Sequence, residues 1–516
     1  MKRSIRILLL PVLSGLALLV SQRVNANNIA TSTGSLTGNT GTTVQVQFNV
    51  AWENSWRINP DRWDAAWIFV KYRSTDGLWR HASLSNTGHV APSGSTITTG
   101  LLDPAAAYNA STNPGVGAFI YRSADGSGTF SANGVQLLWN YGVNGVSLAN
   151  VLEVRVFAIE TVYVPQGAFA AGSGGSETNA FTLTTISTAS ASTAPTGSGG
   201  LGGQAGGYPT GQTAPVASFP NGFGAFYCMK YEMSQQGYAD FLNTLTYDQQ
   251  VTRTSTAPNS TAGTGALNET NQNRTGIDIQ TPGVASTTPA VYACNLNGNT
   301  SYGEATDGKD IACNYLNWGD LTAYLDWSGL RPLTELEYEK ACRGTIAPVA
   351  NEFAWGTAGI CTSVYTLANA GANNEGIATN YSTTLGNAGY SATTQFFVTR
   401  VGIYAANAAN SGRVTAGASY YGIMELTGNL FERPVTIGNA NGRAFTGTHG
   451  NGALVANGDP DGTTWPAPAT ADGSGYKGGC FIDTFQDISV SNRGSVGSAN
   501  TGRYGYSGGR GVRTAP

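Results

Sequence analysis

The chain carries few side chains suited to acid–base or metal chemistry. In 516 residues there are only three histidines, which are His81, His89 and His449. His449 lies in the glycine-rich segment 447–450, near Asp459 and Asp461, and is therefore the one candidate for proton transfer. A lone histidine in such a loop is more often a solvated surface residue. The sequence contains no Ser–His–Asp spacing, phosphate-binding loop or dinucleotide fingerprint, so no common catalytic class is indicated.

Two short helices joined by a tight turn are predicted in the middle of the chain. Apolar residues of the segment 318–325 lie on one helical stripe, which Gly329 ends. A second helix is expected to start at Thr334, because Glu337 stands three residues further on and completes a capping box. The apolar neighbours placed to close a hydrophobic staple across this start are Leu333 and Tyr338.

This helix pair resembles the helical signature of the formylglycine-generating enzyme family, whose members are also called sulfatase-modifying factors. Other segments are similar to blocks of the same family and follow in the same order, over about two thirds of the chain. Ile159 to Phe169 looks like the opening strand of the family, and residues 226–245 resemble its first helix. The remaining blocks are 353–356, 422–432, 477–481 and 509–513.

The resemblance implies an α+β fold of the C-type lectin type with little regular secondary structure. Enzymes of the family bind copper through two cysteines near the C-terminus and convert a sulfatase cysteine to formylglycine. Here the second cysteine position, which follows Arg493, is Gly494, and its partner position is Ser489. Because copper(I) needs thiolate ligands, we expect no copper site and no oxidase activity of this kind.

A related branch of the family makes sulfoxides with a non-haem iron held by histidines of an added helical domain. The extra N-terminal region of this chain is predicted to be β, and its histidines do not match the expected iron site. An oxidoreductase of the family that uses unrecognised residues stays an alternative.

The resemblance also implies one calcium site. The family's ligands correspond to the side chains of Glu425 and Glu432 and to the backbone carbonyls of Gly428 and Leu430. Two carboxylates, two carbonyls and water suit calcium, which takes six to eight oxygen ligands. Arg433 stands where the family has a tryptophan and would place a positive charge beside the ion. The alternative is that Glu432 pairs with Arg433 or with another cation.

The C-terminal segment 489–516 resembles the ends of non-enzymatic relatives that display ligand-binding residues on this fold. Within it, Asn500, Arg503, Tyr504 and Tyr506 are of the residue types that dominate adaptable recognition surfaces. We therefore predict a ligand surface in this segment. The alternative is that these residues only close the fold.

The first 26 residues are predicted to be a secretory signal peptide. Basic residues (Lys2, Arg3 and Arg6) precede an apolar core, residues 7–20, and the segment 24–26 has the small residues of a cleavage site. We expect a secreted or cell-surface protein with no lipid anchor and no membrane span. The formal net charge of −4, which becomes more negative without the signal peptide, argues against nucleic acid as a partner.

The remaining chain is expected to form two domains. Residues 27–158 are predicted to be a β-sandwich, because apolar and polar residues alternate from Val44 to Val50. Residues 159–516 are the family domain, with a low-complexity surface loop over 171–215 that cannot bury enough apolar surface to fold alone. Four tryptophans lie close together in this region. Aromatic residues at this density in a small sandwich are usually core residues, so we prefer that interpretation to a sugar-binding platform. The four tryptophans are Trp52, Trp56, Trp63 and Trp67.

All six cysteines lie in the second domain. They are widely spaced and form no CxxC pair, so zinc binding and redox exchange are not indicated. Structural disulfides and buried free thiols are the two alternatives. The six are Cys228, Cys294, Cys313, Cys342, Cys361 and Cys480.

Together these features predict an exported, non-catalytic member of the family that binds or displays an extracellular ligand, either a glycan or a protein. A structural subunit of an extracellular assembly, which would associate with itself, is a further alternative. The low content of charged residues, 11%, suits that alternative.

Overall fold

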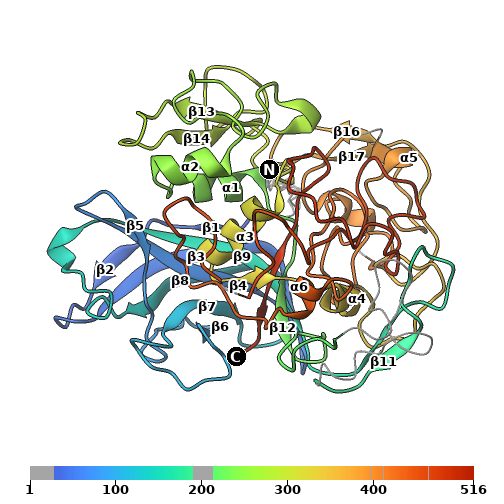
Figure 1. Ribbon diagram of the computed structural model, residues 1–516, viewed down its shortest axis with the longest axis horizontal. Coiled ribbons are helices and arrows are strands. Elements are labelled where there is room, and N and C mark those ends of the chain that lie inside the picture. Colours follow the sequence, from blue (N-terminus) through green and yellow to red (C-terminus); the bar gives the residue numbers. More distant parts are fainter. Residues whose placement is uncertain (1–27, 190–212, 395–396, 411, 463) are drawn as a thin grey trace, which may run out of the picture.

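The computed structural model describes residues 28–189, 213–394, 397–410, 412–462 and 464–516 (Figure 1). The predicted signal peptide, residues 1–26, lies outside the described residues, and so does most of the predicted loop 171–215. The described fold is α+β and mostly β, with one large antiparallel sheet and short helices.

Two β layers form the N-terminal region. In the first layer, β3 pairs with β8 along most of its length, while β1 and β2 pair with the other edge of β3. In the second layer, β4 pairs with β9 on one edge and with β5 and β7 on the other, and β6 pairs with β7. The strands are β1 (Ala30–Thr31), β2 (Ser35–Thr37), β3 (Val44–Ile58), β4 (Arg62–Ser74), β5 (Trp79–His81), β6 (Ser95–Leu101), β7 (Gly115–Arg122), β8 (Gly126–Trp139) and β9 (Val151–Val164).

The two layers enclose a core formed by alternate residues of each strand. Every second residue of β3 from Val44 to Trp52 is buried, and these side chains pack against alternate residues of β4, including Ile68 and Val70. The alternation predicted from the sequence is therefore confirmed. Trp52 in this core is 1% exposed, and Trp67 on the opposite face of β4 is fully buried. The two half-buried tryptophans are Trp56 and Trp63.

The sheet continues from the N-terminal region into the C-terminal region. The last residues of β9 pair with β12 (Phe226–Met229), which pairs with β18 (Gly511–Thr514), and β18 pairs with β15 (Arg331–Pro332). The predicted family domain begins at Ile159, which lies inside β9. One continuous strand therefore serves both regions.

Both regions also share a hydrophobic core. The face of β4 that looks away from the sandwich core carries Ala65, Trp67 and Phe69, which are buried in one cluster with residues of the helices. Phe69 contacts Trp327 edge-on, with ring centroids 4.9 Å apart. The indole Nε1 of Trp67 donates a hydrogen bond to the carbonyl of Ser328 (2.8 Å). This part of the second layer is thus buried on both of its faces.

The two helices predicted in the middle of the chain are confirmed. They are α3 (Trp318–Trp327), which is followed by Gly329 at a φ of 72°, and α4 (Glu335–Arg343). The capping box is complete, because Thr334 Oγ1 accepts from the Glu337 N–H (3.1 Å) and Glu337 Oε2 accepts from the Thr334 N–H (3.0 Å). The staple residues Leu333 and Tyr338 lie in one buried cluster.

The helix predicted over residues 226–245 is only partly correct. Its first four residues form β12, because they complete the sheet between β9 and β18. The helix α1 (Gln235–Leu242) begins after Ser234, whose side chain accepts a hydrogen bond from the Gly237 N–H. The pairing partners of β12 lie far away in sequence, so helical spacing alone did not reveal this strand.

The described part of the segment 171–215 is not a surface loop. Residues 184–186 form β11 (Thr184–Ile186), which pairs with β10 (Phe169–Ala171). Phe181 and Ile186 are 2% exposed and belong to the large shared core. The remaining elements are α2 (Tyr247–Arg253), α5 (Ser391–Thr394), α6 (Ala440–Arg443), β13 (Ile277–Thr281), β14 (Val291–Cys294), β16 (Thr366–Ala368), β17 (Gly376–Thr379), η1 (Leu148–Asn150), η3 (Gln272–Arg274), η4 (Ile403–Ala405) and η5 (Ala408–Asn410).

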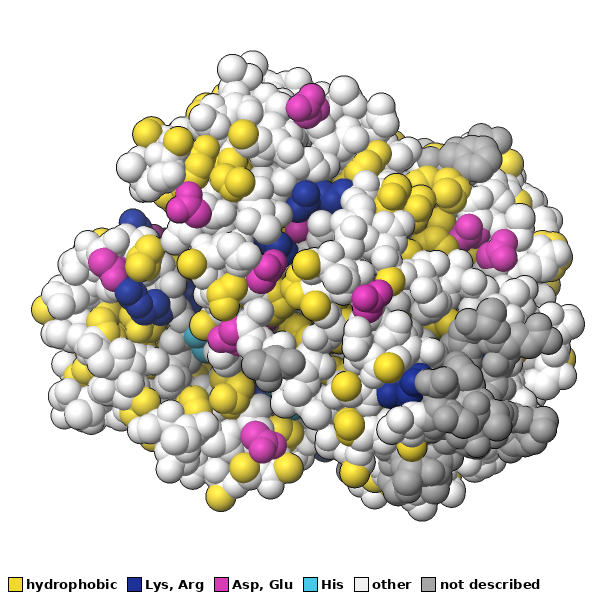
Figure 2. Space-filling model, in the orientation of Figure 1, with side chains coloured by type: hydrophobic (Ala, Val, Ile, Leu, Met, Phe, Trp, Pro, Cys, Tyr) yellow, Lys and Arg dark blue, Asp and Glu magenta, His cyan; other side chains and the backbone are white. Residues whose placement is uncertain are grey.

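All six cysteines are buried and carry free thiols, so the second of the two alternatives holds in this structure. Within the described ranges, no helix has the length and apolar character needed to cross a membrane. Figure 2 shows few charged side chains on the face presented, where they lie singly or in small groups among uncharged atoms.

Candidate functional site

The two residues predicted to stand at the family's cysteine positions differ in burial, because Ser489 is buried and Gly494 is exposed. Ser489 is 2% exposed, and its Oγ donates to the carbonyl of Gln486 (2.9 Å). The Gly494 N–H donates to Asn492 Oδ1 (2.8 Å). Between them, the buried guanidinium of Arg493 pairs with Glu335 at 2.8 Å. Neither Ser489 nor Gly494 can supply the thiolate that copper(I) requires.

The segment after β10 covers this turn. The Arg493 N–H donates to the carbonyl of Thr178 (2.8 Å), and the Arg493 guanidinium lies 3.8 Å from the ring centroid of Phe181. A Cβ built at Gly494 would come within 3.5 Å of the Thr178 side chain. Residues that the sequence presented as a loop therefore pack against Arg493, between the two positions predicted to match the family's cysteines.

His449 is a buried structural residue, not the solvated one that its sequence indicates. Its Nε2 accepts from the Thr514 N–H (3.0 Å), so its Nδ1 carries the proton and faces the Leu102 carbonyl (3.2 Å). Burial lowers the pKa of His449 well below its usual value. Its sequence neighbour Asp459 pairs with Arg253 at 2.8 Å. The ring is thus held neutral with both nitrogens occupied, as a structural role requires.

The two predicted calcium-ligating carboxylates lie in the buried core. Glu425 Oε1 accepts from the Gly402 N–H (2.9 Å), and Glu432 Oε1 accepts from the Arg510 Nε (2.5 Å). Their second oxygens, both Oε2, are buried and have no hydrogen-bond partner among the described residues. Each carboxylate therefore keeps one oxygen for a further ligand.

A third carboxylate, Glu232, belongs to the same cluster and was not found from the sequence. It accepts from the Asn429 side chain (2.5 Å) and from the Leu430 N–H (2.8 Å), and so fixes the backbone of the predicted calcium segment. Burial, and then the charge of Glu432, raises the pKa of Glu232 well above its usual value. Burial likewise raises the pKa of Glu425 to about 7.

These residues fit a calcium ion only in part. The unpartnered oxygens and the raised pKa values favour a cation near Glu425 and Glu432. Arg510 already brings one positive charge to Glu432, and the described residues contain no group of three or more His, Cys, Asp or Glu side chains placed to hold a metal. The expected neighbour Arg433 points elsewhere, with its guanidinium donating to the Asn500 carbonyl (2.7 Å). Calcium binding stays a prediction.

The C-terminal segment presents an aromatic cluster. The rings of Tyr504 and Tyr506 are stacked, with centroids 5.2 Å apart and planes inclined by 3°. Tyr506 also meets Phe431 edge-on at 5.8 Å, and Phe431 contacts Tyr476 at 4.9 Å. Tyr504 is 39% exposed, while Tyr476 is buried. The cluster thus has a buried base and an outer pair, Tyr504 exposed and Tyr506 half-buried, which we call the tyrosine pair.

The other two residues predicted for this surface have structural roles. Both guanidinium branches of Arg503 bind the buried carboxylate of Asp320, at 2.7 and 2.8 Å. The Asn500 side chain accepts from the Gly502 N–H (2.9 Å), and its carbonyl accepts from Arg433. These contacts fix the backbone that carries the tyrosine pair, so only Tyr504 and Tyr506 remain as ligand-binding candidates.

One comparison with known proteins agrees with the motifs. A model of the sulfatase-modifying factor enzyme 1-like domain matches residues 158–515. Among solved structures, Treponema denticola variable protein 1 is similar at 13% identity, with 69% of this chain and 96% of that chain covered and a TM-score of 0.28. No curated protein matches the chain. Because the family model covers well over half of its length, this chain belongs to the sulfatase-modifying factor enzyme 1-like domain family.

Proposed function

We propose that the protein is an exported, non-catalytic member of this family that binds an extracellular ligand through the tyrosine pair. The observation that carries the proposal is the parallel stack of the exposed Tyr504 on the half-buried Tyr506. Tyrosine suits recognition because it offers a large, rigid and amphipathic contact area at a low cost in conformational entropy. The domain would thus use a fold of the C-type lectin type for display.

The backbone beneath the tyrosine pair supports this proposal. The Phe431 N–H donates to the Tyr506 carbonyl (3.1 Å), and the Tyr315 N–H donates to the Tyr504 carbonyl (3.1 Å). With the Arg503–Asp320 pair, these bonds hold the segment from several directions. A surface that is already ordered loses less entropy on binding, so its affinity is higher for the same contacts.

The positions that match the family's cysteines support the non-catalytic part of the proposal. Ser489 and Gly494 lack thiolates, and Arg493 beside them is fixed by contacts with Thr178 and Phe181. We expect the mature protein to hold no stoichiometric copper and to leave the cysteine of a sulfatase-type peptide unchanged. Metal analysis after copper(I) loading and mass spectrometry of the peptide test this. One tightly held copper per chain, or conversion of cysteine to the aldehyde, would contradict the proposal.

The binding part is tested on arrays of glycans and extracellular proteins. The mature wild type, the double variant Tyr504→Ala/Tyr506→Ala and the control Tyr108→Ala in the β6–β7 loop are applied side by side. We expect the double variant to lose the ligands that wild type and control retain. Ligands that all three bind equally would place recognition elsewhere, and a large fall in melting temperature of the double variant would show that the pair is core.

A further inference from the structure

A groove separates the N-terminal sandwich from the α1–α2 region. It consists of two adjoining cavities of about 590 and 860 Å³, between β5 on one side and the start of α2 on the other. The outline of the molecule is indented there, between the region of β5 and the region of α2, β13 and β14 (Figures 1 and 2). The walls shared by both cavities are formed by Leu78, Trp79, Thr244, Leu245, Thr246 and Gln249.

Strand register explains the floor of the groove. Phe69 of β4 lies opposite Phe157 of β9, and both contact Trp327 beneath the C-terminal region. Two and four residues further along β4, the same face carries Lys71 and Arg73. The part of this sheet face that lies beneath the C-terminal region is therefore apolar. The part of the same face that lines the groove carries charged and aromatic side chains. The cross-strand neighbours of Lys71 and Arg73 are His81, Trp79, Arg155 and Glu153.

Positive charge is in excess around Trp79. Glu153 accepts from both Arg73 (3.0 Å) and Arg155 (2.6 Å), so two guanidinium groups share one carboxylate. The Arg155 guanidinium lies 4.7 Å from the Trp79 ring centroid. The Arg155 side chain is 42% exposed, so its pairing with Glu153 is weak and open to competition from a ligand. Two arginines and an aromatic ring thus meet in one part of the groove, whose lining elsewhere carries the paired Arg80 and Asp76 and the carboxylate of Asp248.

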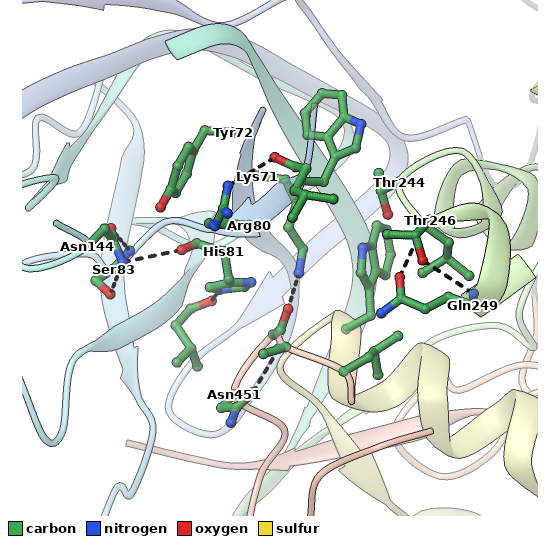
Figure 3. A pocket seen from close by; sticks show the side chains of 18 of the residues that line it. Lys71, Tyr72, Arg80, His81, Ser83, Asn144, Thr244, Thr246, Gln249 and Asn451 are labelled. Atoms are coloured by element: carbon green, nitrogen blue, oxygen red, sulfur yellow. Dashed lines mark hydrogen bonds between the residues drawn. The ribbon is translucent and has the colours of Figure 1, made fainter. Parts of the chain in front are cut away.

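Deeper in the groove, two donors have unused hydrogen-bonding capacity. Lys71 Nζ donates to the Gly452 carbonyl (2.6 Å) and keeps further N–H groups, while burial lowers the pKa of Lys71 well below its usual value. The buried Nε1–H of Trp327 has no acceptor among the described residues. His81 Nε2 faces the Val116 carbonyl (2.6 Å), and its buried Nδ1 also has no partner among the described residues. Figure 3 shows Lys71 and His81 across the cavity from Thr246 and Gln249.

We propose that this groove binds an acidic oligosaccharide. Sugar hydroxyls form hydrogen bonds with polar side chains of the lining such as Gln249, and the apolar face of a pyranose packs on an indole ring such as that of Trp79. A uronate carboxylate pairs with the guanidinium groups that share Glu153, and arginine binds carboxylates in bidentate geometry. Both cavities have the size of ordinary ligand sites, and an oligomer spans the two. The site is separate from the tyrosine pair and does not depend on the proposed function.

The test uses the mature full-length protein and a galacturonate oligomer, with its methyl ester as the uncharged form of the same chain. We expect calorimetric titration to show binding of the acid and at least about tenfold weaker binding of the ester. Trp79→Ala and Arg155→Gln should each weaken binding of the acid by about tenfold or more, as central contacts do. The control Arg62→Gln changes an equally exposed arginine outside the groove and should leave binding unchanged.

Each other outcome overturns the proposal. If neither oligomer binds, the groove is not a saccharide site. If the ester binds as tightly as the acid, the ligand is not recognised by its charge. If Arg155→Gln, whose side chain is exposed enough to be replaced without loss of folding, binds like the wild type, the groove is not where the oligomer sits. The double variant Tyr504→Ala/Tyr506→Ala should retain binding, and its loss would assign the oligomer to the tyrosine pair.

Discussion

At the scale of single residues, many of the few charged side chains form buried ion pairs. Arg343 pairs with Glu339 at 3.0 Å, Arg493 with Glu335 at 2.8 Å, and Arg510 with Glu432 at 2.5 Å. These side chains are at most 1% exposed. Removing one partner of such a pair leaves an uncompensated charge in the core, which costs about 3–5 kcal/mol. The pairs therefore fix which arrangement of the loops is stable.

The buried carboxyl of Glu425 predicts a specific dependence of stability on pH. Burial raises its pKa from 4.5 to about 7, so the folded state binds more protons than the unfolded state between these values. The free energy of unfolding therefore falls as the pH rises through this window, because Glu425 must ionise in the core. The loss amounts to roughly 1.4 kcal/mol per unit of pKa shift.

Glu425→Gln removes this titration. We expect the variant to gain stability relative to wild type as the pH rises from about 5 to about 8, because only the wild type must charge a buried carboxyl. Urea unfolding in the presence of a chelator measures the difference. The exposed control Glu269→Gln should follow the wild type. Parallel profiles of Glu425→Gln and wild type would show that Glu425 does not titrate in this window.

Calcium is expected to stabilise the same cluster. An ion that binds only the folded state adds about 2.7 kcal/mol to the free energy of unfolding at a hundredfold excess over its Kd. Melting of the wild type with chelator and with millimolar calcium measures the effect, and Glu432→Gln should abolish it. If calcium leaves the wild-type transition unchanged, Arg510 is the sole cationic partner of Glu432.

At the scale of elements, the starts of α3 and α4 are fixed by capping boxes, and a glycine follows each of these two helices. The Thr334 side chain caps α4 and also donates to the Pro220 carbonyl (2.8 Å). This one hydroxyl therefore joins the helix start to the segment before β12. Such a cap contributes to the stability of the whole domain, because α4 carries Glu335, Glu337 and Glu339, which pair with buried arginines.

Thr334→Ala is expected to lower the free energy of unfolding by about 1–2 kcal/mol, the usual effect of losing an N-cap. Chemical denaturation measures it. Thr334→Ser should restore most of the stability because serine keeps the hydroxyl, and Thr33→Ala in an exposed position should have no effect. A Thr334→Ser variant as unstable as Thr334→Ala would assign the loss to the missing methyl group instead.

At the scale of the whole molecule, the sandwich and the family domain form one folding unit. β9 pairs with β4 along the sandwich and with β12 in the family domain, and a single hydrophobic cluster extends across both. Cutting the chain at residue 158 would divide β9 and expose Trp67, Phe69 and Phe119. Neither part has a complete core without the other.

We therefore expect one cooperative thermal transition for the mature protein. Differential scanning calorimetry tests this, because a two-state unit gives equal calorimetric and van't Hoff enthalpies. A fragment of residues 159–516 should lack a cooperative transition. Two separate transitions in the full chain, or a stable fragment, would show that the sandwich folds independently.

The sequence by itself determined features that depend on residues close together in the chain. The capping box of Thr334 and Glu337 and the strand alternation from Val44 to Val50 follow from local spacing, and the structure has both. The absence of thiolates at Ser489 and Gly494 is likewise a matter of residue type in a family motif. These features are local because a few hydrogen bonds or one strand period decide them.

Only the tertiary structure decided which side chains meet across the fold. It pairs Arg503 with Asp320 and thereby removes Arg503 from the predicted ligand surface. It brings Glu232 to Glu425 and Glu432, and Arg510 in place of Arg433 to the same cluster. It also forms the groove from β4, β5, β9 and residues that follow α1. In each case the partners lie far apart in sequence, and burial determines their interaction energy, which spacing along the chain does not encode.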